Sequence, residues 1–241
     1  MLLPPSTATA NSDQPCHPNT CLQIMITPTS SPVTLYGAGG HAEVVLATLT
    51  AGGRHVIAVF DDEPLRMRLG GHPVDHGMPA NGRLTVDLTA STVIVSIGAN
   101  KTRASVAARL NAEFTTAVHP NAIVSTDAQI GAGTVVFHRA IVQHDTIIGQ
   151  HVIVNTSAVI GPMCWISDFV HVSPGATLGG EVNVGEGTHI GAAAVIGDGV
   201  QIGAWSTIGA GAIILHDVSI GQVIVGNPTR NITQIPQQPA D

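Results

Sequence analysis

A six-residue repeat runs through the second half of this chain and restricts its fold more than any other feature. Eighteen consecutive aliphatic residues recur at every sixth position from Val118 to Ile220. The residue four places after each of them is Ala, Thr, Val, Cys, Ser or Ile, and Gly often follows directly. An α-helix would scatter a six-residue period around its axis, because it has 3.6 residues per turn. The repeat therefore predicts a parallel β-helix in which three short strands form each triangular coil.

The repeat also assigns a place to each type of residue. We expect the aliphatic residues to fill the interior, the small residues to fit beside the corners, and Gly to relieve strain where the chain bends. An aromatic content of only 3% and a charged content of 10% agree with an aliphatic lattice of stacked coils. We place the β-helix at residues 118–225 and a C-terminal tail at residues 226–241.

Residues 32–113 have a different pattern, in which apolar strands alternate with helices. Strands are expected at residues 33–36, 55–60 and 92–97, and helices at residues 42–51 and 101–111. Strands that alternate with helices predict a small parallel α/β sheet, whose ligand crevice lies at the carboxyl ends of the strands.

Composition and charge exclude several classes of partner. Nine Lys and Arg residues against a net charge of −7, with no basic run, argue against a nucleic-acid partner. No apolar stretch reaches the length of a membrane span. Residues 1–31 contain no Lys or Arg and are rich in Pro, Ser, Thr and Asn, so we expect either a disordered tail or an over-extended start with Met25 as the initiator. No signal peptide is recognisable, so we expect a cytoplasmic protein. Three cysteines are too few for a disulfide framework, and no metal site is expected.

The glycine-rich turn after the first strand admits more than one interpretation. Gly37, Gly39 and Ala42, with Asp61 further along, superficially match the dinucleotide fingerprint. The α/β region is too short for two mononucleotide-binding halves, so a half-site for one sugar nucleotide fits better than NAD. The alternative is a tight turn between strand and helix that binds nothing.

The sequence resembles the sugar O-acyltransferase family, which includes bacterial sialic acid O-acetyltransferases and nucleotide-4-amino-sugar N-acetyltransferases. The resemblance covers residues 33–230 and depends on the order and spacing of the segment YGAGGHAEVV at residues 36–45, Asp61-Asp62, Ser96-Ile97-Gly98 and the hexapeptide array. It implies a Rossmann-like domain at residues 32–113, a left-handed parallel β-helix and a homotrimer. It also implies transfer of acetyl from acetyl-CoA to the amine or hydroxyl of a sugar.

The same resemblance implies two sets of binding residues. In the substrate set, the turn and helix start would hold the phosphates or sugar, the two aspartates would reach the nucleoside, and the last glycine would line the crevice: Gly37, Gly39, Gly40, His41, Asp61, Asp62 and Gly98. In the acetyl-CoA set, the histidine would contact the acetyl group, the small residues the pantetheine arm, and the arginine a phosphate: His171, Gly180, Ala192, Ala210 and Arg230.

One position departs from the family. The family's base histidine lies nine residues before the histidine that contacts acetyl, and here that position is Pro162. His144-Asp145 lies one coil earlier in the same column, so His144 is a candidate base with Asp145 as the group that orients it. A solvated surface histidine is the other interpretation of His144. The competing functions are a non-catalytic homologue that binds sugar nucleotide and CoA, and a serine O-acetyltransferase, which is disfavoured because its N-terminal part would be helical.

Overall fold

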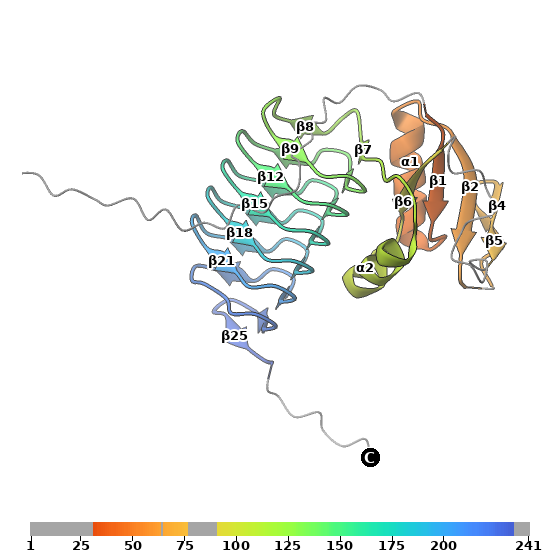
Figure 1. Ribbon diagram of the computed structural model, residues 1–241. Coiled ribbons are helices and arrows are strands. Elements are labelled where there is room, and N and C mark those ends of the chain that lie inside the picture. Colours follow the sequence, from red (N-terminus) through yellow and green to blue (C-terminus); the bar gives the residue numbers. More distant parts are fainter. Residues whose placement is uncertain (1–30, 64, 77–90, 234–241) are drawn as a thin grey trace, which may run out of the picture.

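The computed structural model describes residues 31–63, 65–76 and 91–233, and it contains two units that lie side by side (Figure 1). One is an α/β unit, and the other is a left-handed parallel β-helix, as predicted. The predicted disordered tail lies outside the described residues, apart from Ser31. Within the described part, neither helix has the length and apolar character that a membrane crossing requires.

The α/β unit is built on a four-stranded parallel sheet in the order β5-β2-β1-β6. The central strand β1 is completely buried, and the two helices contribute to separate hydrophobic clusters of this unit. A short antiparallel hairpin, β3 with β4, was not foreseen from the sequence. The elements are β1 Val33–Tyr36, α1 Gly40–Ala51, β2 Val56–Asp61, β3 Arg68–Leu69, β4 His72–Pro73, β5 Asp75–His76, β6 Thr92–Val95 and α2 Asn100–Arg109.

The β-helix has three sheets, one for each side of its triangular coil. The first sheet contains β7 Ala117–Val118, β10 Val135–Val136, β13 Ile153–Val154, β16 His171–Val172, β19 His189–Ile190, β22 Thr207–Ile208, β24 Val223–Val225 and β25 Arg230–Asn231. The second contains β8 Ile123–Val124, β11 Ile141–Val142, β14 Val159–Ile160, β17 Thr177–Leu178, β20 Val195–Ile196 and β23 Ile213–Ile214. The third contains β9 Gln129–Ile130, β12 Ile147–Ile148, β15 Trp165–Ile166, β18 Asn183–Val184 and β21 Gln201–Ile202.

The aliphatic repeat packs inside the coils, as the sequence predicts. In most of these two-residue strands the second residue is buried, while the first points outward. Neighbouring coils pair in parallel with an offset of one coil, as in Val154 with Val172 and Val172 with Ile190. The interior is a continuous aliphatic cluster from Val136 to Val218.

The last aliphatic position of the repeat is an exception. Ile220 is 75% exposed, whereas Val218 is 7% exposed and bridges to Ile202 in its place. The final coil is shorter than the others, because Thr207 pairs with Val223 rather than with the residue eighteen positions on. The expectation that Ile220 fills the interior was therefore wrong: the shortened coil moves the register by two residues.

The glycines that follow the aliphatic residues have a different role from the one expected. The residues in the left-handed region recur at every sixth position from Gly133 to Gly211, and nine of them are not glycine. The glycines of the repeat instead permit close contact between coils: a Cβ on Gly131 would lie 2.5 Å from the carbonyl carbon of Gly149. Backbone proximity, and not conformational freedom, explains why most of these positions require Gly.

The first part of the predicted C-terminal tail is folded. β25 turns back and pairs antiparallel with β24, so that Arg230 lies opposite Val225. The Thr233 hydroxyl accepts a hydrogen bond from the Val223 amide at 2.7 Å. The β-helix therefore ends in a hairpin rather than in a free strand.

The α/β unit docks on the first coils of the first sheet. Val135 and Ile153, which point outward from that sheet, belong to the same hydrophobic cluster as α1 residues Val45 and Leu49. Further along, Asn100 at the start of α2 donates hydrogen bonds to the carbonyls of Gly187 and Thr188. This docking brings the carboxyl edge of the α/β sheet next to β16 and β19.

Candidate active site

The glycine turn between β1 and α1 leaves open space at the start of a helix. Gly37 has a φ of +113°, and a Cβ there would lie 2.7 Å from the Ile97 side chain. In the part of the chain that the structure describes, a Cβ on Gly39 or Gly40 would meet nothing within 4 Å, and no side chain caps α1. Unpaired amides at a helix start favour an anion such as phosphate. Gly39 has a φ of −75°, which any residue can adopt. A side chain at this position would therefore fill the open space without straining the backbone.

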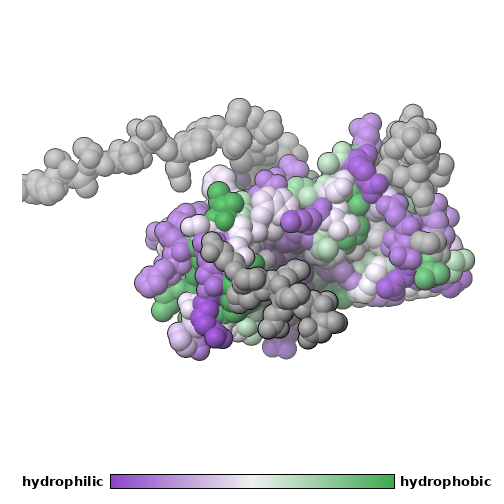
Figure 2. All heavy atoms as spheres, turned by 90° about the horizontal axis from the view of Figure 1, so that it is seen from below, coloured by the Kyte–Doolittle hydropathy of each residue, from purple (hydrophilic) through white to green (hydrophobic). Residues whose placement is uncertain are grey.

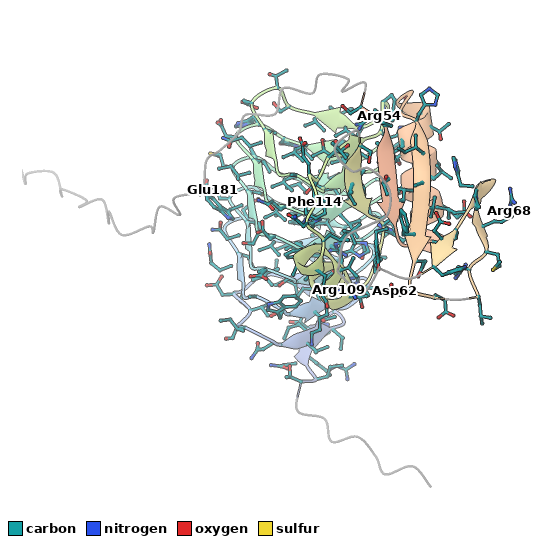
Figure 3. The ribbon with its side chains drawn as sticks, turned by 45° about the vertical axis from the view of Figure 1, so that its right-hand side comes forward. Arg54, Asp62, Arg68, Arg109, Phe114 and Glu181 are labelled. Atoms are coloured by element: carbon teal, nitrogen blue, oxygen red, sulfur yellow. The ribbon has the colours of Figure 1, made fainter. Side chains whose placement is uncertain are left out.

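Asp61 and Asp62 lie beside this turn, and both carboxylates have protein partners. Asp61 accepts a hydrogen bond from the Ala38 amide at 2.5 Å, which ties β2 to the glycine turn. Asp62 accepts from the Tyr36 hydroxyl at 2.6 Å and from Arg109 at 3.1 Å (Figure 3). Burial, and then the hydrogen bond to Asp62, raise the pKa of Tyr36, and the same bond lowers the pKa of Asp62. Contact of these aspartates with a nucleoside stays a prediction.

Two residue sets that the sequence treated separately meet where the two units join. The ring centroids of His41, from α1, and His171, from β16, lie 6.2 Å apart. A Cβ on Gly98 would lie 3.6 Å from the Cβ of His41, and the Gly98 backbone is close enough to His171 to influence the pKa of that imidazole. His189, one coil further along, contacts His171 edge-on with ring centroids 5.0 Å apart. We call His41, His171 and His189 the histidine row.

The histidine row is held in its neutral form. Burial lowers the pKa of His171 to about 3, assisted by the charges of His189 and Arg103, and lowers that of His41 to about 4. The pKa of His189 is also lowered, mainly by burial. Nε2 of His171 lies 3.0 Å from Nδ2 of Asn155, and Nε2 of His41 is buried with no hydrogen-bond partner among the residues that the structure describes. Neutral imidazoles in such a site can donate to a carbonyl oxygen or accept a proton.

The candidate base lies elsewhere on the chain. His144 and Asp145 occupy the corner between the second and third sheets, which is opposite the first sheet that carries His171. Their side chains are 54% and 65% exposed, and Nδ1 of His144 lies 3.3 Å from Asp145. Pro162 stacks directly beneath, because the next residue, Met163, donates to the His144 carbonyl at 3.0 Å. Asp127, which sequence reasoning missed, lies beside both, with ligand atoms of all three within 4.8 Å of one another.

The predicted acetyl-CoA residues are divided between two corners. Gly180 follows Pro162 at the corner between the second and third sheets. Ala192 and Ala210 are exposed at the corner between the first and second sheets, and Arg230 is exposed on β25. A single chain therefore does not bring these residues together with the histidine row.

Comparison with known proteins identifies the family. Residues 32–110 match the PglD N-terminal domain, and residues 181–216 match the bacterial transferase hexapeptide of six repeats. The structure of a variant of perosamine N-acetyltransferase from Caulobacter crescentus, in complex with CoA and GDP-perosamine, matches with a TM-score of 0.78 and 31% identity. The match covers 83% of this chain and 96% of that one. The chain belongs to the hexapeptide-repeat sugar acyltransferase family.

Two further members of this acyltransferase family are similar to the chain. The acetyltransferase domain of PglB from Neisseria gonorrhoeae FA1090 matches with a TM-score of 0.78 and 32% identity, over 84% of this chain and 100% of that one. UDP-N-acetylbacillosamine N-acetyltransferase from Bacillus subtilis strain 168 is 38% identical over 108 residues, or 43% of this chain. That match spans 50% of the length of the curated relative.

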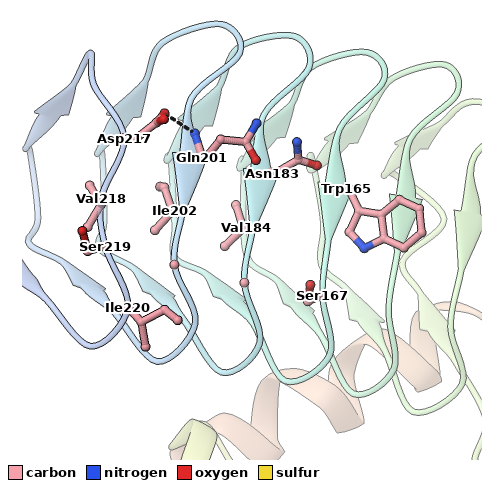
Figure 4. A pocket seen from close by; sticks show the side chains of 12 residues that line it. Trp165, Ser167, Asn183, Val184, Gln201, Ile202, Asp217, Val218, Ser219 and Ile220 are labelled. Carbon is pink, nitrogen blue, oxygen red and sulfur yellow. Dashed lines mark hydrogen bonds between the residues drawn. The ribbon is translucent and has the colours of Figure 1, made fainter. Parts of the chain in front are cut away.

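The described part of the chain also has a hollow on the outer face of the third sheet. It has a volume of about 650 Å³ and extends to the shortened last coil (Figure 4). Trp165, which is 52% exposed, stands at one end of it, with Asn183 and Gln201 on the next two coils. The residues that line it include no predicted site residue, and sequence reasoning did not single out Trp165.

The glycine turn provides a test that separates the fold from ligand binding. Gly39→Val is expected to fold normally, because its backbone is extended, but to weaken sugar-nucleotide binding about tenfold or more by filling the open space. Gly37→Val should destabilise the fold itself, because its φ is +113° and Ile97 blocks the side chain. Calorimetric titration of each ligand, with urea unfolding, measures both effects. Equal loss of CoA and sugar-nucleotide binding in Gly39→Val would contradict separate pockets.

Proposed function

We propose that this chain is an acetyl-CoA-dependent N-acetyltransferase that acts on the amine of a nucleotide-linked amino sugar. The observation that carries the proposal is the contact of His41 with His171: the glycine turn that would hold the acceptor meets the face that would hold the acetyl group. The relatives named above are N-acetyltransferases, and one was crystallised with CoA and a nucleotide amino sugar. This favours an amine over a hydroxyl as the acceptor.

The roles of the residues follow from the geometry. The amides at the start of α1 would bind the phosphates, with Asp61 and Asp62 toward the nucleoside, and Gly98 beside the sugar. The amine attacks the thioester carbonyl, a C–N bond forms, and the C–S bond to CoA breaks. Nε2 of neutral His171 accepts from Nδ2 of Asn155, so His171 would donate its Nδ1–H to the carbonyl oxygen as negative charge develops there. The amine proton leaves to a base, and the CoA thiolate takes up a proton.

A homotrimer would complete the site. The outward residues of the second sheet are all β-branched, and they form a flat face along the β-helix: Ile123, Ile141, Val159, Thr177, Val195 and Ile213. Hydrophobic surface is visible on the β-helix half of the molecule (Figure 2). The two corners that flank this face carry His144 and Gly180 on one side, and Ala192 and Ala210 on the other. Three-fold packing about this face would place one chain's His144 corner beside the next chain's Ala192 corner, where acetyl-CoA would bind.

In this arrangement His144 would take the base role that Pro162 cannot perform. It lies one coil above Pro162, a displacement of about 4.8 Å. The Asp145 carboxylate would orient its imidazole and stabilise the imidazolium that forms. The competing proposal is a binding protein without catalysis, and the observation that favours it is the proline itself.

A thiol-release assay decides between catalysis and binding. The chain would be incubated with acetyl-CoA and a panel of UDP-, GDP- and dTDP-linked 4-amino sugars. Release of CoA thiol with at least one of them is the expected result. Calorimetric binding of both ligands without thiol release would establish the non-catalytic alternative, and binding of neither would contradict both proposals.

A further inference from the structure

One buried cation joins the two units next to the histidine row. Arg103, on α2, is 1% exposed, and it is among the largest fully buried side chains. Its guanidinium makes five hydrogen bonds, all to carbonyl or amide oxygens. It donates to the carbonyls of Ile97, Gly98, His151 and Phe169 and to Oδ1 of Asn100, at 2.8 to 3.1 Å.

These bonds connect three separate parts of the molecule. Ile97 and Gly98 belong to the loop after β6, and Asn100 begins α2. His151 and Phe169 lie one coil apart at the corner between the third and first sheets. A planar fork with five donors can hold such a junction, whereas a lysine ammonium has three donors and no fixed plane. Because Gly98 lies between His41 and His171, the position of the histidine row depends on this junction.

We propose that Arg103 is a positioning residue for acetyl transfer, which fixes Gly98 between His41 and His171 and holds a positive charge beside the histidine row. The proposal rests on the proposed function. It assigns to α2 a part in the reaction beyond docking, since Arg103 would act through the histidines and would not touch the substrate.

The charge of Arg103 faces histidines on every element packed around it. They are His41 of α1, His151 at the corner, His171 of β16 and His189 of β19. Burial is the main cause of the lowered pKa in all four, and the charge of Arg103 lowers each of them further. The described partners of Arg103 are dipoles without net charge, and none of them is a carboxylate that would cancel its field at the histidines.

Two variants separate the charge of Arg103 from its geometry. Arg103→Lys keeps the charge and loses the fork, whereas Arg103→Gln removes the charge. Lys101→Gln, on the exposed side of the same helix, is the matched control. Histidine resonances of the free protein would be titrated by NMR, and kcat and KM measured across pH.

In Arg103→Gln we expect the pKa values of His41 and His171 to rise by about one unit, because a buried positive charge beside them is removed. In Arg103→Lys the pKa values should stay low while kcat falls about 10²-fold through misplacement, with less change in KM. Unshifted pKa values in a folded Arg103→Gln variant would overturn the charge role. An unchanged kcat in Arg103→Lys would overturn the positioning role.

If Arg103→Gln does not fold, Asn100→Ala tests the positioning role. It removes one partner of Arg103 and keeps the charge, so kcat should fall while the histidine pKa values hold. Wild-type protein without acetyl transfer would refute the proposed function and not the charge role, because the NMR titration requires no substrate.

Discussion

Acidification below about pH 6.5 is expected to destabilise the protein steeply, at a pH where exposed carboxylates still keep their charge. Folding lowers the pKa of His41 and of His151 to about 4, and that of His171 to about 3, mainly through burial. In the unfolded chain each titrates near its ordinary value of about 6.5. As pH falls below that value, the unfolded chain takes up protons that the folded chain does not accept, so acid favours unfolding.

The magnitude of this effect is large. Each such histidine removes up to about 1.4 kcal/mol of unfolding free energy per pH unit between its unfolded and folded pKa values. Three together remove about 4 kcal/mol per unit, against a typical total stability of about 5–15 kcal/mol. Above pH 7 these histidines are neutral in both the folded and the unfolded chain. The free energy of unfolding should therefore not vary with pH through these groups. Urea unfolding followed by circular dichroism from pH 7.5 to 5.5 measures the slope.

The variant His151→Phe tests whether His151 contributes to the slope of unfolding free energy against pH. His151 stacks on Phe169 with an interplanar angle of 2° and contacts Phe114 edge-on, and its buried Nδ1 has no hydrogen-bond partner within residues 31–63, 65–76 and 91–233. A phenyl ring should keep this packing and lose the titration, so about a third of the slope should disappear. His216→Phe, at an exposed position, should leave the slope as it is. An unchanged slope in His151→Phe would show that acid acts through other groups.

The second expected result is complementation between two inactive variants. His144→Ala and His171→Ala should each lose about 10²–10⁴-fold in rate, the range that general acid–base groups supply. Within one chain these residues lie on opposite sides of the coil, so a trimer would pair His144 of one chain with His171 of the next. In mixed trimers about one quarter of the interfaces would place an unmutated His144 of one chain beside an unmutated His171 of the next. Co-expressed variants with different tags should therefore regain that share of activity.

Several outcomes of this experiment would contradict the proposal. A stable monomer by light scattering at micromolar concentration would contradict the trimer. A silent His144→Ala would remove His144 as the base, and Pro162→His would then be expected to raise the rate. If His144 is the base, Pro162→His should change little. Mixed variants as inactive as their parents would show that the site does not cross between chains.

The sequence predicted the architecture because the period of six is a local signal repeated many times. The same signal could not reveal the shortened last coil, since Ile220 continues the pattern and still points into solvent. The sequence also could not predict which corner residues adopt the left-handed conformation. Arg139, Met163 and Trp205 have no preference for that conformation, and the coil imposes it on them.

The site was predicted in parts, and its assembly depends on long-range geometry. The sequence analysis predicted both His41 and His171 as binding residues, but in separate sets. Their contact arises when the two units dock through Arg103, and nothing in the sequence distinguishes Arg103 from an ordinary arginine on a helix. A usable signal did exist for the other half of the site. Nine residues separate Pro162 from His171, which is half a coil, so the two positions must face opposite sides of one chain.

The hairpin at the end of the β-helix affects whether molecules of this protein can stack end to end. A parallel coil presents unpaired amides and carbonyls at its end, and a second molecule could stack there in the same register. β25 occupies that edge of the first sheet and runs in the opposite direction. A further parallel coil cannot continue from it. The strand thus blocks parallel stacking on the first sheet at this end of the β-helix, in an architecture that would otherwise favour fibres.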